Sequence, residues 1–417
     1  MLKNYFKSEF NKNVLVLLKG TTIAQGLSIL ISPILSRIYT PKEFGVFALY
    51  ASIVGIIGVI ATGRYELSIV ISKSDEEANS LVKLSLKIAL FISGGLMVLA
   101  LFLADYFATI LKTPEIKNWL YIVPVSVFLL AFYNTFNLLF TRFKAFNKIS
   151  NAGIIQSTTT NGLNLGLGLF NNGALGLILG QIIGQLASVV YLFKSNGYSL
   201  STIRKSKMRV GKKYAHFPLK NGLSGFLNIL ANQLPVLLIS SLFGAAIIGF
   251  YSLVLKVLNL PMSLIGKSFS QVYYQKIAEI HKNEDDGEFR FVRNTTLKLL
   301  ALGAIPSIIL FLFGEELFSF VYGDEWVFSG QIASLFAFFY LIRFVYFSQS
   351  TYLIAKEKLG IELILNSIMF ILQIGAIFFG YYFFKDAYLT FLFMAISGGL
   401  SYLLFLFVVF NIAKKNA

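Results

Sequence analysis

The sequence predicts an all-α protein that crosses a membrane many times. Of its 417 residues, 56% are hydrophobic and only 13% are charged, which leaves more apolar surface than a water-soluble domain of this size can cover. The apolar residues form repeated runs of about 20 residues, the length of a helix that spans a bilayer, and they lack the alternation of barrel strands. We therefore expect a polytopic bundle of transmembrane helices.

Twelve apolar stretches lie between clusters of charged residues. The predicted spans are 14–36, 44–72, 82–104, 119–141, 151–170, 173–193, 217–241, 247–269, 294–313, 327–352, 359–383 and 387–410. The first span follows a basic segment without a small-residue cleavage site, so we expect it to act as an uncleaved signal anchor. The segment 271–293 is predicted to be a solvated cytoplasmic connection.

Lysine and arginine are concentrated on one side of these spans. If the N-terminus is cytoplasmic, the outer side holds only Arg37, Lys42, Lys112, Lys117 and Lys385 of the 36 Lys and Arg residues. Because cytoplasmic loops carry the excess of positive charge, both termini are predicted to be cytoplasmic. The basic loop between the sixth and seventh spans then faces anionic lipid headgroups, which accounts for the net charge of +16 without a nucleic-acid partner.

The composition excludes several kinds of site. The chain has no cysteine, and His216 and His281 are too far apart for a metal cluster. The predicted outer loops are too short to build an ordered catalytic centre. We expect no metal, no redox cofactor and no enzymatic activity.

The two halves of the chain resemble each other. Residues 44–49, Phe-Gly-Val-Phe-Ala-Leu, align with residues 248–253, Ile-Gly-Phe-Tyr-Ser-Leu, at an offset of 204. Each segment begins the second span of its half, so the two copies share one orientation. A parallel repeat of this kind predicts two six-helix lobes around a central cleft. The predicted lobes are 1–196 and 217–417, joined by a basic cytoplasmic linker at 197–216.

Amide and hydroxyl side chains indicate which helix faces line this cleft. Gln25 and Ser28 share one face of the first span, and Asn228 and Asn232 share the equivalent face of the seventh. Small polar residues also pack membrane helices against one another. Cleft lining and helix packing therefore both explain these faces.

Three cations lie within predicted spans, namely Arg64, Lys256 and Arg343. Lys256 shares a polar face of the eighth span with Asn259, and an ionised lysine near mid-membrane costs roughly 3 kcal/mol unless it meets water or an anion. We expect Lys256 to face the cleft, and a structural pair with a buried carboxylate is the alternative. Arg343 shares a face with Tyr340, which suits a phosphate or a sugar, but snorkelling to the cytoplasmic surface explains its position equally well.

Arg64 and Glu66 are two residues apart in the second span. In a regular helix they point to nearly opposite sides and cannot pair. The pattern of neighbours places Glu66 toward the cleft, on the face of Ser52, unless Gly63 breaks the helix. A carboxylate in the cleft can couple transport to protons or sodium ions, whereas a salt bridge to another helix is the alternative.

Several segments resemble one protein family. Residues 35–45, Leu-Ser-Arg-Ile-Tyr-Thr-Pro-Lys-Glu-Phe-Gly, resemble the junction of the first two helices in polysaccharide-biosynthesis flippases of the multidrug/oligosaccharidyl-lipid/polysaccharide exporter superfamily. Residues 249–252, Gly-Phe-Tyr-Ser, followed by Lys256, are similar to that family's eighth-helix pattern, and residues 141–144 are similar to its fourth-to-fifth connection. The resemblance covers the whole chain.

The resemblance implies a Wzx-type flippase for O-antigen or capsule units in the bacterial inner membrane. Such a protein moves undecaprenyl-diphosphate-linked oligosaccharide from the cytoplasmic to the periplasmic leaflet by alternating access, among membrane lipids and other polysaccharide-assembly proteins. The implied substrate-binding cations are Lys256, Arg343 and Arg64. Gln233 stands where many relatives carry an acidic residue, and this departure counts against an ion site at that position. Glu66, from its place on the second span, and Gln233 are the two candidates for coupling to H⁺ or Na⁺.

Two other functions are consistent with parts of the sequence. A cation-coupled drug exporter of the same superfamily would need an acidic residue in the first span to attract cationic substrates, and that span has none. A scaffold for glycan assembly that transports nothing would not need polar faces at equivalent positions of two lobes.

Overall fold

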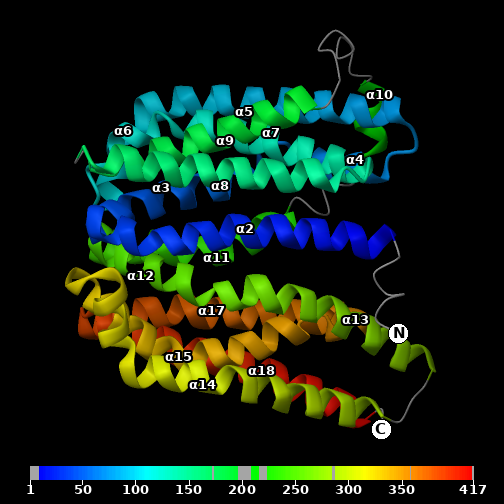
Figure 1. Cartoon of the computed structure of the whole chain (residues 1–417), viewed down its shortest axis with the longest axis vertical. Coiled ribbons are helices and arrows are strands. Elements are labelled where there is room, and N and C mark those ends of the chain that lie inside the picture. The colour runs from blue at the N-terminus through cyan, green and yellow to red at the C-terminus, as the bar shows by residue number, and fades with distance from the viewer. Residues whose placement is uncertain are drawn as a thin grey trace. The chain divides into compact units, whose positions relative to one another are not determined.

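The computed structural model is helical throughout the part of the chain that it describes. The described residues are 9–170, 173–195, 208–215, 223–283, 287–356 and 358–415. Within these ranges there is no β-strand. The chain divides into two compact units, which we call unit 1 (residues 1–249) and unit 2 (residues 250–417) (Figure 1).

Unit 1 contains the helices of the first seven predicted spans. They are α2 (Glu9–Ile38), α3 (Pro41–Ile60), α5 (Asp75–Ile110), α7 (Val123–Arg142), α8 (Phe146–Gly168), α9 (Leu175–Ser195) and α11 (Leu223–Phe243), with the short helices α4 (Ser68–Ile71), α6 (Ile116–Leu120) and α10 (Met208–Lys213). α2 packs against α8, α8 against α9, and α5 against α7. α11, which the repeat assigns to the second lobe, packs against α3.

Unit 2 contains the helices of the remaining spans. α12 (Ala245–Leu258) passes from unit 1 into unit 2, followed by α13 (Lys267–Asn283), α14 (Glu288–Tyr322), α15 (Val327–Gln349), α16 (Tyr352–Ala355), α17 (Leu359–Phe384) and α18 (Ala387–Lys415). α15 is central, because it packs against both α14 and α18, and α18 packs in turn against α17.

The helices have the lengths and surfaces of a protein that spans a membrane. Among the described residues, nine helices are long and apolar enough to cross a bilayer, and two shorter apolar helices are Ile229–Phe243 and Ala245–Leu258. Phe91 and Phe102 on α5 are 83% and 79% exposed, as expected where lipid replaces water as solvent. The chain is a multi-span membrane protein. The number of twelve spans stays a prediction.

The expectation of one continuous helix over 44–72 is wrong. α3 ends at Ile60, and after a turn a 3₁₀ segment, Tyr65–Leu67, leads into α4. In the turn, Gly63 has φ +59° and Arg64 has φ +60°. Glycine adopts positive φ without steric cost, but a residue with a Cβ loses roughly 1–2 kcal/mol there. The break is therefore a specific feature that brings Arg64 into an uncommon conformation.

The eighth predicted span, 247–269, is interrupted as well. α12 ends at Leu258, and Met262–Gly266 form a π-helical turn directly after Pro261. Proline has no N–H to donate into a helix, which explains the interruption at this point. α13 then continues to Asn283, so the connection predicted at 271–293 is largely helical.

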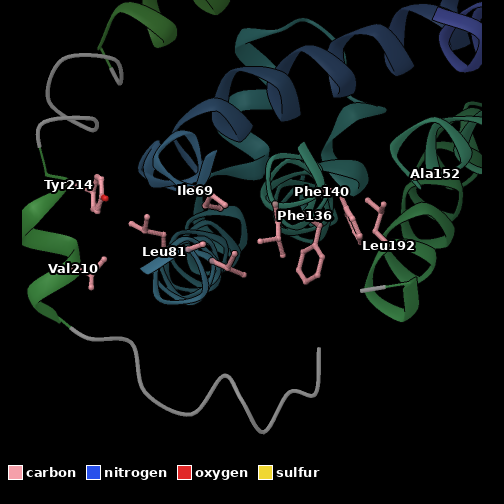
Figure 2. Packing of buried hydrophobic residues seen from close by; sticks show 11 residues of the cluster. Ile69, Leu81, Phe136, Phe140, Ala152, Leu192, Val210 and Tyr214 are labelled. Atoms are coloured by element: carbon pink, nitrogen blue, oxygen red, sulfur yellow. The ribbon is translucent and has the colours of Figure 1, made fainter. Parts of the chain in front are cut away.

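A cluster of buried apolar residues holds α4, α5, α7, α8, α9 and α10 together in unit 1. Figure 2 shows Val210 and Tyr214, at the α10 segment, pointing toward Leu81 of α5, with Phe136 of α7 beyond it. This packing places part of the predicted linker 197–216 on the protein itself. α10 lies beside the end of α5 that carries Asp75 (Figure 1).

Candidate functional site

Arg343 of α15 lies among four tyrosines. Its Nη1 donates a hydrogen bond of 2.7 Å to the hydroxyl of Tyr340, and its guanidinium carbon is 4.9 Å from the centre of that ring. Tyr402 of α18 also lies close enough to interact with the guanidinium. Tyr251 of α12 and Tyr346 of α15 lie close enough to interact with its charge. We call Arg343 and these four tyrosines the Arg343 cage.

Ring packing makes this cage rigid. The rings of Tyr346 and Tyr402 stack with their centroids 4.4 Å apart, and Tyr402 stacks on Phe339 at 5.8 Å. Tyr251 and Tyr402 keep only 5% and 6% of their surface exposed. Three helices of unit 2, namely α12, α15 and α18, therefore hold the guanidinium in a fixed aromatic environment.

No carboxylate among the described residues neutralises Arg343. The groups that interact with its charge are the four tyrosines of the cage. Phenol oxygens accept hydrogen bonds and ring faces attract cations, but a neutral tyrosine carries no negative charge. The guanidinium therefore keeps its full positive charge, and its planar fork suits a phosphate group.

Lys256 lies in the last turn of α12, ahead of the interruption at Pro261. Its side chain is half-buried, and within the described ranges it makes no ion pair. The alternative of a structural pair with Glu66 finds no support, because the partner of Glu66 is Arg64. Asn259 follows Lys256 by one helical turn and is also half-buried.

Arg64 and Glu66 form an ion pair, contrary to the expectation for a regular helix. Nη1 of Arg64 lies 3.8 Å from Oε1 of Glu66, because the break at Gly63 turns both side chains to the same side. Glu66 is buried, and the hydroxyl of Thr62 donates a hydrogen bond to its Oε2. The Nε of Arg64 is buried without a hydrogen-bond partner among the described residues. Unit 1 thus contains a buried charged cluster at this break.

The other predicted site residues belong to α2 and α11 of unit 1. Gln233 accepts a hydrogen bond of 2.9 Å from Oγ of Ser52, so its amide connects α11 to α3. Asn232 is exposed and Gln25 is half-buried. The side chain of Asn228 lies outside the described residues. Substrate contact by the two asparagines and Gln25 stays a prediction.

Part of the polar face of α2 packs against α8. Oγ of Ser28 lies 3.1 Å from Oγ of Ser157 and accepts a hydrogen bond of 2.9 Å from Nδ2 of Asn161. Ser157 also donates to the carbonyl of Ala24 at 2.7 Å. Such hydrogen bonds join helices in a membrane. For Ser28, helix packing is the explanation that the structure shows.

The sequence predicts Tyr340 beside Arg343 but not the other three tyrosines of the cage. Tyr340 and Tyr346 lie three residues before and after Arg343, so helical spacing alone points to both. Tyr251 belongs to the repeated segment 248–253. Tyr402 comes from a distant helix, and no local pattern predicts it. Among the described residues, no group of three or more His, Asp or Glu side chains is arranged to hold a metal ion.

Comparison with known protein sequences connects the chain to polysaccharide biosynthesis. Residues 34–331 match the profile of a family described as polysaccharide biosynthesis protein. The chain is 21% identical over 359 residues to an uncharacterized membrane protein in the cps region of Klebsiella pneumoniae, covering 83% of this chain and 71% of that protein. It is 22% identical over 315 residues to the succinoglycan biosynthesis transport protein ExoT of Rhizobium meliloti (strain 1021), covering 75% and 62%.

Comparison with solved structures identifies the fold. The lipid II flippase MurJ in its inward closed conformation aligns with a TM-score of 0.75 and 16% identity, covering 95% of this chain and 87% of MurJ. An inward-facing multidrug resistance MATE family transporter of the MOP superfamily aligns with a TM-score of 0.70 and 15% identity, covering 94% and 96%. The chain has the helical fold that these two transporters share.

Proposed function

Since the chain belongs to the family of polysaccharide biosynthesis proteins, we propose that it is a flippase for lipid-linked oligosaccharide. It moves an undecaprenyl-diphosphate-linked repeat unit from the cytoplasmic to the outer leaflet of the bacterial inner membrane by alternating access. The fold shared with a lipid II flippase and the similarity to a succinoglycan transport protein support this proposal. Both termini are cytoplasmic in this proposal, as the distribution of Lys and Arg predicts.

The observation that carries the proposal is the uncompensated charge of the Arg343 cage. Arg343 is half-buried, and a charge partly removed from water costs free energy unless an opposite charge accompanies it, which no carboxylate of the described residues supplies. The diphosphate of the substrate carries about two negative charges, which meet the same cost within the membrane. When the substrate binds, the positive charge of Arg343 and the negative charge of the diphosphate therefore compensate each other. Lys256, also in unit 2, supplies a second cation for the same purpose.

Ion coupling is proposed to depend on Glu66. Its carboxylate is buried and interacts with Arg64 and with the Thr62 hydroxyl. Protonation of Glu66, or binding of a cation to it, therefore changes the interactions of both neighbours. Gln233 is a weaker candidate, because its amide carries no charge and already binds Ser52. The coupling ion is H⁺ or Na⁺.

A multidrug exporter is the second candidate, because a MATE transporter has the same fold. Drugs exported by such proteins are commonly cationic. Arg343 and Lys256 without carboxylate partners in the described residues would repel a cation in a low-dielectric site. This charge distribution favours an anionic substrate.

Leaflet transfer of a fluorescent polyprenyl-diphosphate oligosaccharide in liposomes tests the proposal. Arg343→Gln removes the charge, and Tyr402→Phe removes one hydroxyl while keeping the ring. Losing a charge-assisted contact of about 1.5–3 kcal/mol corresponds to a decrease in transfer of about 10- to 100-fold for Arg343→Gln. We expect a smaller decrease for Tyr402→Phe.

Arg290→Gln is the matched control, because Arg290 is an exposed arginine of α14 in the same unit. This variant is expected to transfer the lipid at the wild-type rate. Transfer that survives Arg343→Gln would contradict the assignment of the cage. Absence of transfer by the wild type, together with export of cationic dyes from the same vesicles, would favour the drug exporter.

A further inference from the structure

Gly45 of α3 and Gly249 of α12 face each other inside unit 1. A Cβ added to Gly45 would collide with the carbonyl of Ala245 and lie 3.1 Å from the backbone nitrogen of Gly249. A Cβ added to Gly249 would collide with the carbonyl of Pro41 and lie 3.1 Å from the backbone nitrogen of Gly45. The two helix backbones are therefore in direct contact, with no side chain between them.

The contact is symmetric in the numbering of the internal repeat. Gly45 and Gly249 are 204 residues apart, and so are their contact partners Pro41 and Ala245. Gly45 contacts Ala245, and their equivalents at the offset of 204, Gly249 and Pro41, contact each other in the same way. Such a reciprocal contact is the signature of a two-fold axis. The offset of 204 is the one at which residues 44–49 align with 248–253.

We propose that a local two-fold axis relates segments 41–45 and 245–249 of unit 1 and passes between Gly45 and Gly249, and that this glycine contact is the seal that closes the outer end of the transport path. The proposal rests on the proposed function, since a seal has a purpose only in a protein that alternates between two openings. The outer side is predicted from the charge distribution, which places the start of α3 and the turn between α11 and α12 there.

Three hydrogen bonds connect the segment after α5 to the end of α11, and the turn at Gly244 joins α11 to the start of α12. Nζ of Lys112 donates to the carbonyl of Leu242 at 3.3 Å, and Oγ of Ser240 donates to the carbonyl of Leu111 at 3.1 Å. The hydroxyls of Thr113 and Ser240 are 3.4 Å apart. The segment after α5 therefore contacts the end of α11 while α3 contacts the start of α12. Together these contacts join α3, α11, α12 and the segment after α5 to one another.

Glycine suits a seal that must also open. Glycine inside a helix costs roughly 0.5–1 kcal/mol relative to alanine, so two equivalent glycines at a contact indicate a requirement for close approach. Two bare backbones exclude water and lipid, yet they interlock no side chains and make only weak Cα–H···O contacts. Such a contact separates without breaking a network of strong bonds.

A disulfide placed beside the seal measures closure without any substrate. The chain has no native cysteine, so Thr113→Cys/Ser240→Cys provides a single pair at positions whose hydroxyls are 3.4 Å apart. The initial rate of disulfide formation is measured in membranes in four backgrounds: unchanged, Gly45→Ala, Gly249→Ala and Gly55→Ala. Gly55 is the matched control on α3, because a Cβ there would lie 3.6 Å from Nε2 of Gln233, an ordinary contact.

We expect Gly45→Ala and Gly249→Ala to slow disulfide formation by about tenfold each, the effect of shifting a closed state against an open one by about 1.4 kcal/mol. Gly55→Ala is expected to match the unchanged background. Unchanged rates in both glycine variants would overturn the seal, and a decrease in only one would overturn the symmetric axis. Labelling of Ser240→Cys by an impermeant maleimide should increase in the same two variants. A thermal unfolding midpoint close to that of the unchanged background distinguishes opening from a failure to fold.

Transport separates this proposal from the proposed function. Oxidation of the cysteine pair in the unchanged background should abolish transfer of the lipid-linked oligosaccharide, and reduction should restore it. Transfer at full rate in the oxidised protein would overturn the seal. If the wild type transfers no lipid-linked oligosaccharide but the disulfide rates follow the expected pattern, the seal holds and the substrate assignment fails.

Discussion

Lys356 and Glu288 form an ion pair buried in unit 2. Nζ of Lys356 lies 2.8 Å from Oε2 of Glu288, with 5% and 3% of the two side chains exposed, and the hydroxyl of Tyr352 donates to Oε1. In unit 1, Arg142 and Asp75 pair at 3.0 Å, but the Asp75 side chain is 67% exposed. In each half of the chain, a carboxylate at the start of the third long helix binds a cation at or just beyond the end of the fourth, since Arg142 is the last residue of α7 and Lys356 follows α15 and α16.

The burial of these two pairs predicts different effects on stability. Lys356→Met leaves Glu288 buried without an opposite charge, so we expect a loss of about 3–5 kcal/mol. Asp75→Asn removes an exposed carboxylate and should cost less than about 1 kcal/mol. Thermal unfolding of the detergent-solubilised protein measures both. Equal losses in the two variants would contradict this prediction.

The helices of the fold were predictable from the sequence, but their interruptions were not. Long apolar stretches identify helices in lipid, and within the described residues each predicted span corresponds to a helix or to a helical segment with a break. The sequence allows a helix break at Gly63 but does not require one, because hydropathy does not report φ angles. Arg64 at φ +60° is an uncommon conformation that packing around it must stabilise.

The charges of the candidate site were predictable, whereas their partners were not. A cation within an apolar stretch is visible in the sequence alone, so hydropathy is enough to identify Lys256 and Arg343 as candidates. Tyr402 reaches Arg343 only through the packing of α18 on α15. Ser28 could not be assigned from its spacing, because a serine that lines a cleft and a serine that binds another helix follow the same pattern.

A double-mutant cycle on Arg64 and Glu66 tests the coupling hypothesis. If Glu66 serves only as the counter-ion of Arg64, then Glu66→Gln and Arg64→Gln each impair transport and the double variant recovers it. If Glu66 carries the coupling ion, the double variant stays uncoupled, and transfer no longer responds to a proton or sodium gradient. We expect the second outcome, measured as gradient-driven leaflet transfer in liposomes.

Thr62→Val provides a control for this cycle. It removes the hydroxyl that donates to Glu66 and preserves the shape of the side chain. In the coupled protein this variant should shift the pH at which transfer is half-maximal, since a hydrogen bond to a carboxylate favours its charged form. A pH profile identical to that of the wild type would count against Glu66 as the titrating group.

The docking of α10 on α5 predicts how the basic linker responds to proteolysis. Lys213 pairs with Glu77, and the Tyr214 hydroxyl donates to the same carboxylate at 2.9 Å. The Tyr214 ring is buried in a cluster that includes Leu81. Tyr214→Ala removes this burial, so we expect trypsin to cleave after Lys212 about tenfold faster, the effect of weakening the docking by about 1.4 kcal/mol. Mass spectrometry of the early fragments identifies the cut.

Tyr214→Phe keeps the ring and loses only the hydroxyl, so its cleavage rate should stay near that of the wild type at low salt and rise when salt screens the exposed ion pair.

The bond to Glu77 raises the pKa of Lys213. A raised pKa means that the contribution of Lys213 is complete below the ordinary lysine value and is lost only as the pH rises through the raised value. Cleavage, expressed relative to that of an unstructured reference peptide so that the pH dependence of trypsin itself cancels, should therefore be constant between about pH 6 and 9. A relative rate that increases across this range would show that another titrating group controls the docking of α10.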